Sequence, residues 1–180
     1  MKRIMLVAVA LVIAFGFAGI ASAKKMYLLN FDKGGMPNDA SGCEFSLSED
    51  KSPKGQIYLK IVPAKEGIMW CGELSPKKAN WDGYDVIKFD YFNEGKVPQS
   101  LVLCIKRKGD KYNTRLDANF VARPGKGSVE IEIAGACGNS GNPIDWKTPV
   151  AQWVISGVKA PIHIGNITLE STEDEKDSKK

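Results

Sequence analysis

The sequence predicts an all-β fold, an antiparallel β-sandwich that forms a single domain over residues 24–170. Short runs of residues with a two-residue hydrophobic period follow one another, separated by clusters of Gly, Pro, Asn and Asp. Helical periodicity is almost absent, and no internal repeat indicates a propeller or solenoid. Because the strands are short and turn signals recur every 8 to 12 residues or so, a sandwich or barrel is the expected architecture.

The two ends of the chain differ in composition from this domain. Residues 1–23 have two basic residues, a long apolar run and the small-residue pattern Ala-Ser-Ala, which together predict a signal peptide. The alternative is a membrane anchor, since the apolar run approaches the roughly 20 residues of a spanning helix. The cleavage pattern favours export, so we expect a periplasmic or secreted protein with no stable membrane span. Residues 171–180 are charged, lack apolar side chains and predict a disordered tail.

The strands of the first half are expected where side chains alternate between apolar and polar. Residues 81–93, WDGYDVIKFDYFN, show this most clearly, because a turn at Asp82 and Gly83 precedes an apolar face of Ile87, Phe89 and Tyr91. Four earlier strands precede this one. They are predicted at residues 26–31, 44–47, 56–62 and 68–74.

The strands of the second half continue the pattern. Residues 100–106 are apolar on both faces until the end, which predicts a strand inside a sheet. Within residues 128–133, apolar side chains alternate with Glu130 and Glu132, which predicts a strand with one face exposed to water. The remaining strands follow from the same two-residue hydrophobic period, and the turns from clusters of Gly, Pro, Asn and Asp. The strand within 81–93 covers residues 86–92. Further strands are predicted at residues 113–121, 152–158 and 162–169, with turns at 33–35, 52–55, 95–98, 108–110, 124–127 and 138–143.

Four widely spaced cysteines in a chain expected to be exported predict two disulfides. They are Cys43, Cys71, Cys104 and Cys137. Three connectivities are open, and we favour Cys43 with Cys71 and Cys104 with Cys137. A structural zinc site would need close C-x-x-C pairs, and a covalent haem would need C-x-x-C-H; the sequence contains neither.

The charge of the chain argues against nucleic acid as a partner. The net charge is +4, and removal of the signal peptide with Lys2 and Arg3 would leave +2. The lysines are scattered, and no repeat of basic and aromatic residues that could stack bases is present.

Several segments, taken in order, resemble the galactose-binding-like jelly roll, and more narrowly the carbohydrate-binding-module-like domains of bacterial exported proteins. They are NFD at 30–32, QIYLKIV, WDGYDVIKFDYFN, LVLCIKRK, YNTRLDANF at 112–120, GKGSVEIEI and HIGNITL. The resemblance implies a non-catalytic binding role. It also implies a structural calcium near the first and last strands, with Asp32 and Asn166 as ligands, although Gly165 stands where relatives often carry Asp and calcium wants six to eight oxygens.

The segment 112–120 offers the residue types that bind sugars. Aromatic faces stack on sugar C–H groups, while carboxylates, amides and Arg bond the hydroxyls. If Leu116, Ala118 and Phe120 face the core, the opposite face carries the candidate ligand-binding residues. These are Arg115, Asp117 and Asn119, with Tyr112 preceding them. The alternative is a solvated face with a minor surface ion pair.

The four tryptophans divide by context. Trp81 at a strand entry and Trp153 in an apolar strand are expected in the core. Trp70 should face away from Cys71, and Trp146 lies in a polar loop where it is either a lid on the core or displayed to a partner. We therefore count Trp70 and Trp146 as ligand candidates.

No catalytic constellation is apparent. His163 is the only histidine, expected on the outer face or edge of a strand, and neither a G-x-S-x-G nucleophile motif nor a phosphate-binding glycine loop occurs. The sequence predicts a non-catalytic module for carbohydrate or cell-envelope glycan. The alternatives are a structural or protein-interaction module of the envelope without a sugar site and, less favoured, a small jelly-roll hydrolase or lyase.

Overall fold

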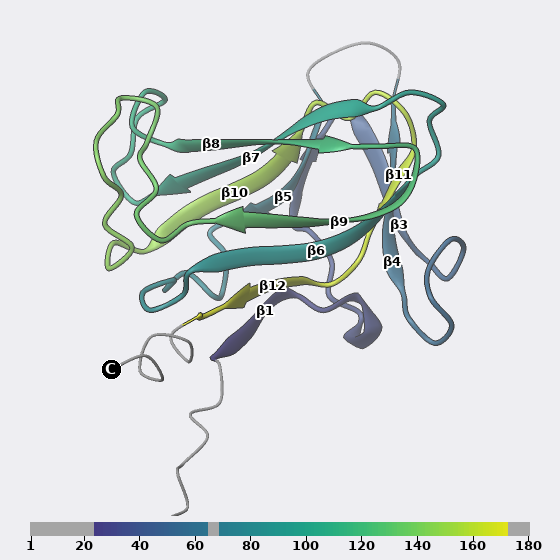
Figure 1. Cartoon of the computed structure of the whole chain (residues 1–180), viewed down its shortest axis with the longest axis horizontal. Helices are drawn as coiled ribbons and strands as arrows, with labels where there is room; N and C mark the ends of the chain where they lie inside the picture. The colour runs from purple at the N-terminus through teal and green to yellow at the C-terminus, as the bar shows by residue number, and fades with distance from the viewer. Residues whose placement is uncertain (1–23, 65–68, 173–180) are drawn as a thin grey trace, which may run out of the picture.

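The computed structural model of the chain describes residues 24–64 and 69–172, and it shows two antiparallel sheets packed face to face (Figure 1). The predicted signal peptide and residues 173–180 of the predicted tail lie outside this part. Ser171 and Thr172, which the sequence assigned to the tail, bond to the domain: Ser171 N donates to Lys24 O and Thr172 N to the Asp85 carboxylate. No helix among the described residues is long and apolar enough to cross a membrane.

The first sheet has seven strands. Strand β6 is central: β9 runs along one edge, and β11 and β12 follow each other along the other edge. Beyond them, β12 pairs with β1, and β11 pairs with β4, which pairs with β3. The bounds are β1 (Lys25–Leu29), β3 (Cys43–Ser48), β4 (Tyr58–Pro63), β6 (Val86–Asn93), β9 (Gly125–Glu132), β11 (Ile162–Ile164) and β12 (Ile167–Glu170).

The second sheet has five strands in the order β2-β5-β10-β7-β8. Both sheets bring together strands that are far apart in the sequence, which is typical of a jelly roll. The bounds are β2 (Asp39–Ser41), β5 (Trp70–Leu74), β7 (Gln99–Arg107), β8 (Leu116–Ala122) and β10 (Val150–Ser156), and a short 3-10 turn, η1 (Phe31–Lys33), follows β1.

The predicted antiparallel sandwich is confirmed, with several differences in the strands. Residues 125–127, predicted as part of a turn, belong to β9, and residues 113–115, predicted as strand, precede β8. Strand β2 was not predicted, because three residues with one apolar side chain carry no periodic signal. The run predicted at 162–169 divides at Gly165 and Asn166, so that β11 joins β4 while β12 joins β1. Gly165 accommodates this division: a Cβ there would lie 3.1 Å from the ring of Tyr58, which packs over it.

The core fills the space between the inner faces of the sheets. Trp81 and Trp153 are fully buried, as predicted. Phe89 of β6 meets Phe120 of β8 edge to face at 5.5 Å, so aromatic contacts join the two sheets directly. The sandwich therefore presents two outer faces on one rigid core.

Candidate functional site

The outer face of the five-stranded sheet carries a cleft of about 550 Å³, within the range of ligand-binding sites. Its lining combines aromatic, apolar, charged and amide side chains from β5, β7, β10 and the chain around the start of β8. The lining residues are Trp70, Val102, Cys104, Lys106, Tyr112, Arg115, Asp117, Gln152, Val154 and Ser156.

Strand register explains why these side chains meet. Ser156 of β10 lies opposite Trp70 on one side and Val102 on the other. In the next outward-facing row Cys104 lies between Val154 and Asp117. Since four adjacent strands lie about 4.8 Å apart, the cleft crosses about 14 Å of sheet from β5 to β8.

Gly72 allows strands β5 and β10, which both contribute to the cleft, to lie close together. It lies opposite Val154, and a Cβ at this position would collide with the Trp153 carbonyl oxygen and stand 2.6 Å from Val154 Cα. Both obstacles are backbone atoms, so only glycine lets β5 approach β10 this closely.

One end of the cleft is a rigid cluster around Arg115. The Arg115 guanidinium stacks 4.0 Å from the ring centroid of Tyr112. Arg115 Nη2 donates to Asp117 Oδ2 at 3.0 Å, with Nε 2.7 Å from the other oxygen, and Asn139 Nδ2 donates to Asp117 Oδ2 at 2.8 Å. The Tyr112 side chain remains 72% exposed. An aromatic surface is thus held in place by an ion pair.

The electrostatics of this cluster keep both partners charged. Burial raises the pKa of Asp117, but the hydrogen bonds from Arg115 and Asn139 outweigh it and lower the pKa overall. Burial likewise opposes the charge of Arg115, and the bond to Asp117 raises the pKa of Arg115 overall. Charged donors and acceptors held this way are prepared to bond hydroxyl groups without reorganisation.

Four of the predicted binding residues meet in this cleft. They are Trp70, Tyr112, Arg115 and Asp117. The predicted alternation of β8 is confirmed, because Leu116, Ala118 and Phe120 pack on the core. Asn119 lies on the outer face opposite Val102 and is exposed, but it does not line the cleft.

Trp146 lies apart from the cleft. The residue is only 9% exposed, its ring stacks on Trp81 at 5.8 Å, and its Nε1 donates to Ile133 O at 2.8 Å. Of the two roles expected for this loop tryptophan, the structure shows the lid on the core. The reason is that the chain between β9 and β10 folds back over the end of the sandwich, where the indole finds a carbonyl partner.

Sequence reasoning missed the middle of the cleft. Val102, Cys104 and Val154 lie on central strands, where an outward apolar side chain looks the same in sequence as an inward one. The signal that could have found them is the strand at 100–106, which was apolar on both faces. One apolar face belongs to the core and the other to the floor of the cleft.

The two residues predicted as calcium ligands do lie together, on η1 and between β11 and β12. Asn166 Nδ2 donates to Asp32 Oδ2 at 2.6 Å, Ile57 N donates to Asp32 Oδ1, and Phe31 N donates to Asn166 Oδ1. The oxygens that calcium would need already accept N–H groups, and the Asn166 amide nitrogen faces the carboxylate. Without a bound ion the two side chains form a hydrogen-bonded clasp between η1 and the start of β12, and calcium at this position stays a prediction.

The predicted disulfides are absent from the structure, in which all four cysteines are free thiols. Cys104 lies on the outer face of β7 with its sulfur 3.8 Å from Ser156 Oγ, while the Cys137 thiol is directed to Gly135 O. Cys43 Sγ donates to the carbonyl oxygen of Trp70 at 3.3 Å, and burial raises the pKa of the adjacent Cys71 to about 12. The even number of cysteines and their spacing in the sequence could not show that the Cys104 and Cys137 thiols have different neighbours.

Comparison with known proteins gives a structural likeness and no sequence match. No family model matches the chain, and no curated protein sequence matches it. The family 11 carbohydrate-binding module of the cellulosomal cellulase Lic26A-Cel5E of Clostridium thermocellum superposes with a TM-score of 0.56 at 13% identity, over 83% of this chain and 95% of that chain. The solution structure of CtCBM11 gives a TM-score of 0.60 at 13% identity, over 84% and 98%.

An exo-beta-agarase also superposes, with a TM-score of 0.66 at 13% identity over 81% of this chain. The match covers 25% of the agarase, so this chain corresponds to about a quarter of that enzyme. At such identities the likeness concerns the fold alone. The chain has the β-sandwich jelly-roll fold of carbohydrate-binding modules.

Proposed function

We propose that this chain is an exported, non-catalytic module that binds carbohydrate or cell-envelope glycan in the cleft of the five-stranded sheet. The observation that carries the proposal is the meeting of Trp70, Tyr112, Arg115 and Asp117 in one cleft. Trp70 comes from β5, whereas Tyr112, Arg115 and Asp117 belong to one short segment at the start of β8, and strand order brings the two together. Their meeting favours a ligand site over a merely solvated face.

The lining suits a sugar chain for two physical reasons. Trp70 and Tyr112 offer aromatic faces for the C–H side of pyranose rings, and the apolar floor adds contact area. Arg115, Gln152 and Lys106 offer donors for ring hydroxyls along the same cleft. A path of about 14 Å across four strands favours an oligosaccharide over a single sugar.

The absence of a second carboxylate supports a binding role without catalysis. Glycosidases place two carboxyl groups about 5 to 9.5 Å apart around the scissile bond. Among the described residues that line the cleft, Asp117 is the only carboxylate, and it is already bonded to Arg115 and Asn139. The signal-peptide composition of residues 1–23 supports export.

Titration of the purified protein with soluble glycans tests the proposal. The panel includes β-glucan and agarose oligosaccharides, because the structural neighbours are a module of a cellulase and part of an agarase. Trp81, Trp146 and Trp153 are buried, so a saturable change in tryptophan fluorescence would report on Trp70. No saturation by any glycan at millimolar concentration would contradict the proposal.

Substitution of the aromatic residues locates the site. We expect Trp70→Ala and Tyr112→Ala each to weaken binding by about tenfold or more, because an aromatic contact contributes on the order of 1 kcal/mol beyond its area. Tyr27→Ala is the matched control, since Tyr27 is a partly exposed aromatic residue on the seven-stranded sheet. An equal loss of affinity in Tyr27→Ala would place the ligand on the wrong face for this proposal.

A further inference from the structure

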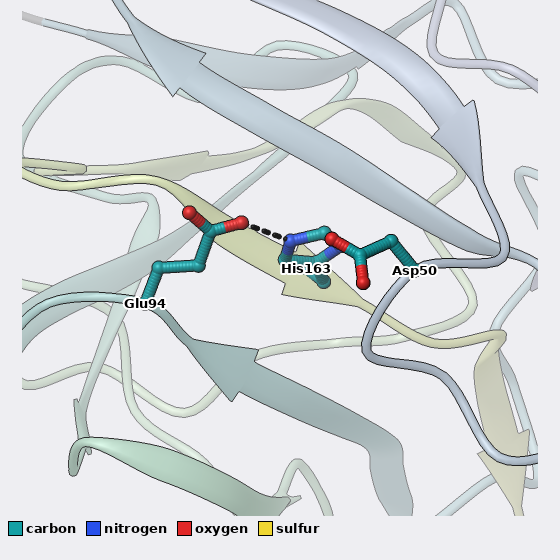
Figure 2. Close-up of side chains that lie close together, drawn as sticks. All are labelled: Asp50, Glu94 and His163. Atoms are coloured by element: carbon teal, nitrogen blue, oxygen red, sulfur yellow. Dashed lines mark hydrogen bonds and ion pairs between the residues drawn. The ribbon is translucent and has the colours of Figure 1, made fainter.

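We propose a second, independent site on the outer face of the seven-stranded sheet, where His163 and Asp50 bind a divalent transition-metal ion of the zinc type and Glu94 orients the imidazole. Figure 2 shows the three side chains together, with Glu94 bonded to one ring nitrogen and the Asp50 carboxylate on the other side of the ring. One ligand atom from each residue lies within 4.8 Å of the others.

The imidazole is held rigidly. His163 is the middle residue of β11, between Lys60 of β4 and Phe92 of β6, and its side chain is fully buried although it lies on the outer face. Phe92 meets the ring edge to face at 6.1 Å. A histidine fixed on three sides keeps one orientation, which a metal ligand requires.

Glu94 determines which nitrogen is available. His163 Nε2 lies 2.6 Å from Glu94 Oε1, the carboxylate oxygen that also pairs with Lys60. A carboxylate that faces a lysine acts as the acceptor, so Nε2 is the donor of this bond and Nδ1 is the nitrogen left for a ligand. Lys60 Nζ, 3.1 Å from the same oxygen, balances the charge of Glu94.

The second ring nitrogen of His163, Nδ1, lacks a partner within the protein. His163 Nδ1 is buried and has no hydrogen-bond partner, which is unusual for a polar atom in a protein interior. A histidine that donates one N–H to a carboxylate and leaves the other nitrogen bare has the arrangement found around metal ions. At the clasp of Asp32 and Asn166, by contrast, each side-chain oxygen accepts a hydrogen bond.

Asp50 supplies the second ligand from the connection between β3 and β4. Its side chain is more than half exposed, and it forms an ion pair with the neighbouring Lys51 at 3.2 Å. Such an exposed pair contributes little and yields readily to a cation. Two ligands about 2.0 to 2.2 Å from zinc stand up to about 4 Å apart, so small shifts would close this geometry, with water completing the coordination. The nitrogen ligand selects zinc-type ions over calcium.

The test uses the fact that His163 is the only histidine in the chain. Long-range proton–nitrogen NMR of the ¹⁵N-labelled, tag-free protein would report on one imidazole alone. Without metal we expect the Nε2–H tautomer, and addition of Zn²⁺ should shift the Nδ1 resonance while Ca²⁺ leaves it unchanged. A Cys137→Ser background removes the exposed thiol as a competing zinc ligand.

Calorimetric titration of variants with Zn²⁺ separates the roles. Asp50→Asn should weaken binding at least tenfold, and Glu94→Gln should weaken it 10- to 100-fold, about the effect typical of groups that orient metal-binding histidines. Lys51→Ala is the matched control on the same connection and should bind at least as tightly as the parent. Unchanged His163 resonances at millimolar Zn²⁺, or equal affinity of Asp50→Asn and the parent, would overturn the proposal.

Discussion

The two outer faces of the sandwich have hollows of similar volume and different chemistry. The cleft of the five-stranded sheet, about 550 Å³, combines aromatic, apolar and rigidly held charged groups. The hollow of the seven-stranded sheet, about 490 Å³, is lined mainly by charged and polar side chains that pair with one another, such as Lys25 with Glu170 at 2.6 Å and Lys88 with Glu130 at 3.3 Å.

The contrast shows that the size of a hollow does not identify a binding site. Ion pairs across neighbouring strands engage Lys25, Lys88, Glu130 and Glu170 of the seven-stranded face, which leaves these groups less to gain from a neutral sugar. On the five-stranded face the charges are fixed beside exposed aromatic surface. That combination favours a ligand with an apolar side and a hydroxylated edge.

The largest difference between the faces should appear when a methyl group is added to a glycine of each. Gly72→Ala in the cleft should destabilise the fold by about 3 to 5 kcal/mol, because the new Cβ would collide with backbone atoms of Trp153 and Val154 that cannot rotate away. Urea denaturation measures the change. A loss below about 1 kcal/mol would show that β5 and β10 do not approach as closely as the structure has them.

Gly165→Ala on the seven-stranded face should cost less, about 1 to 2 kcal/mol. Here the new Cβ would stand 3.1 Å from the ring of Tyr58, a side chain that can shift by a few tenths of an ångström. The same denaturation experiment applies. If Gly165→Ala proved more damaging than Gly72→Ala, the stated packing of the two faces would be wrong.

Asp117→Asn in the cleft should destabilise the fold by about 1 kcal/mol at pH 7, because it weakens a charged, partly buried hydrogen bond to Arg115. The pKa of Asp117 is lowered in the folded state, so its contribution is present above the unfolded pKa of about 3.9 and is lost as pH falls through the folded value. The difference between the variant and the parent should therefore shrink as pH falls below about 3.9 and vanish once Asp117 is protonated in the folded state. A difference that persists there would mean that packing, and not charge, is responsible.

Lys88→Ala on the seven-stranded face should change stability least, by less than about 0.5 kcal/mol. Lys88 bridges Glu130 at 3.3 Å and Glu170 at 3.6 Å, but the lysine side chain is over one third exposed and screened by solvent. Denaturation with and without 0.5 M NaCl checks this expectation. A large, salt-sensitive loss would show that these ion pairs hold the face together more than their exposure suggests.

The sequence by itself determined the features that depend on neighbouring residues. Alternation along 112–120 assigned Leu116 and Phe120 to the core and Arg115 and Asp117 to the outer face, because the two-residue period of a strand is a local property. The same reasoning gave the sandwich and nearly all of its strands. It could not tell whether Trp146 would be displayed or buried, since this depends on how its loop folds over Trp81.

The tertiary structure decided which distant segments meet. Two strands, β10 and β7, lie between Trp70 and Asp117, and only strand order makes these side chains two sides of one cleft. The structure likewise placed Asp50 and Glu94 around His163, and it separated Cys104 from Cys137. The physical reason is that β-sheets are joined by non-local backbone hydrogen bonds, and one sequence pattern fits many strand orders until the core packs in one of them.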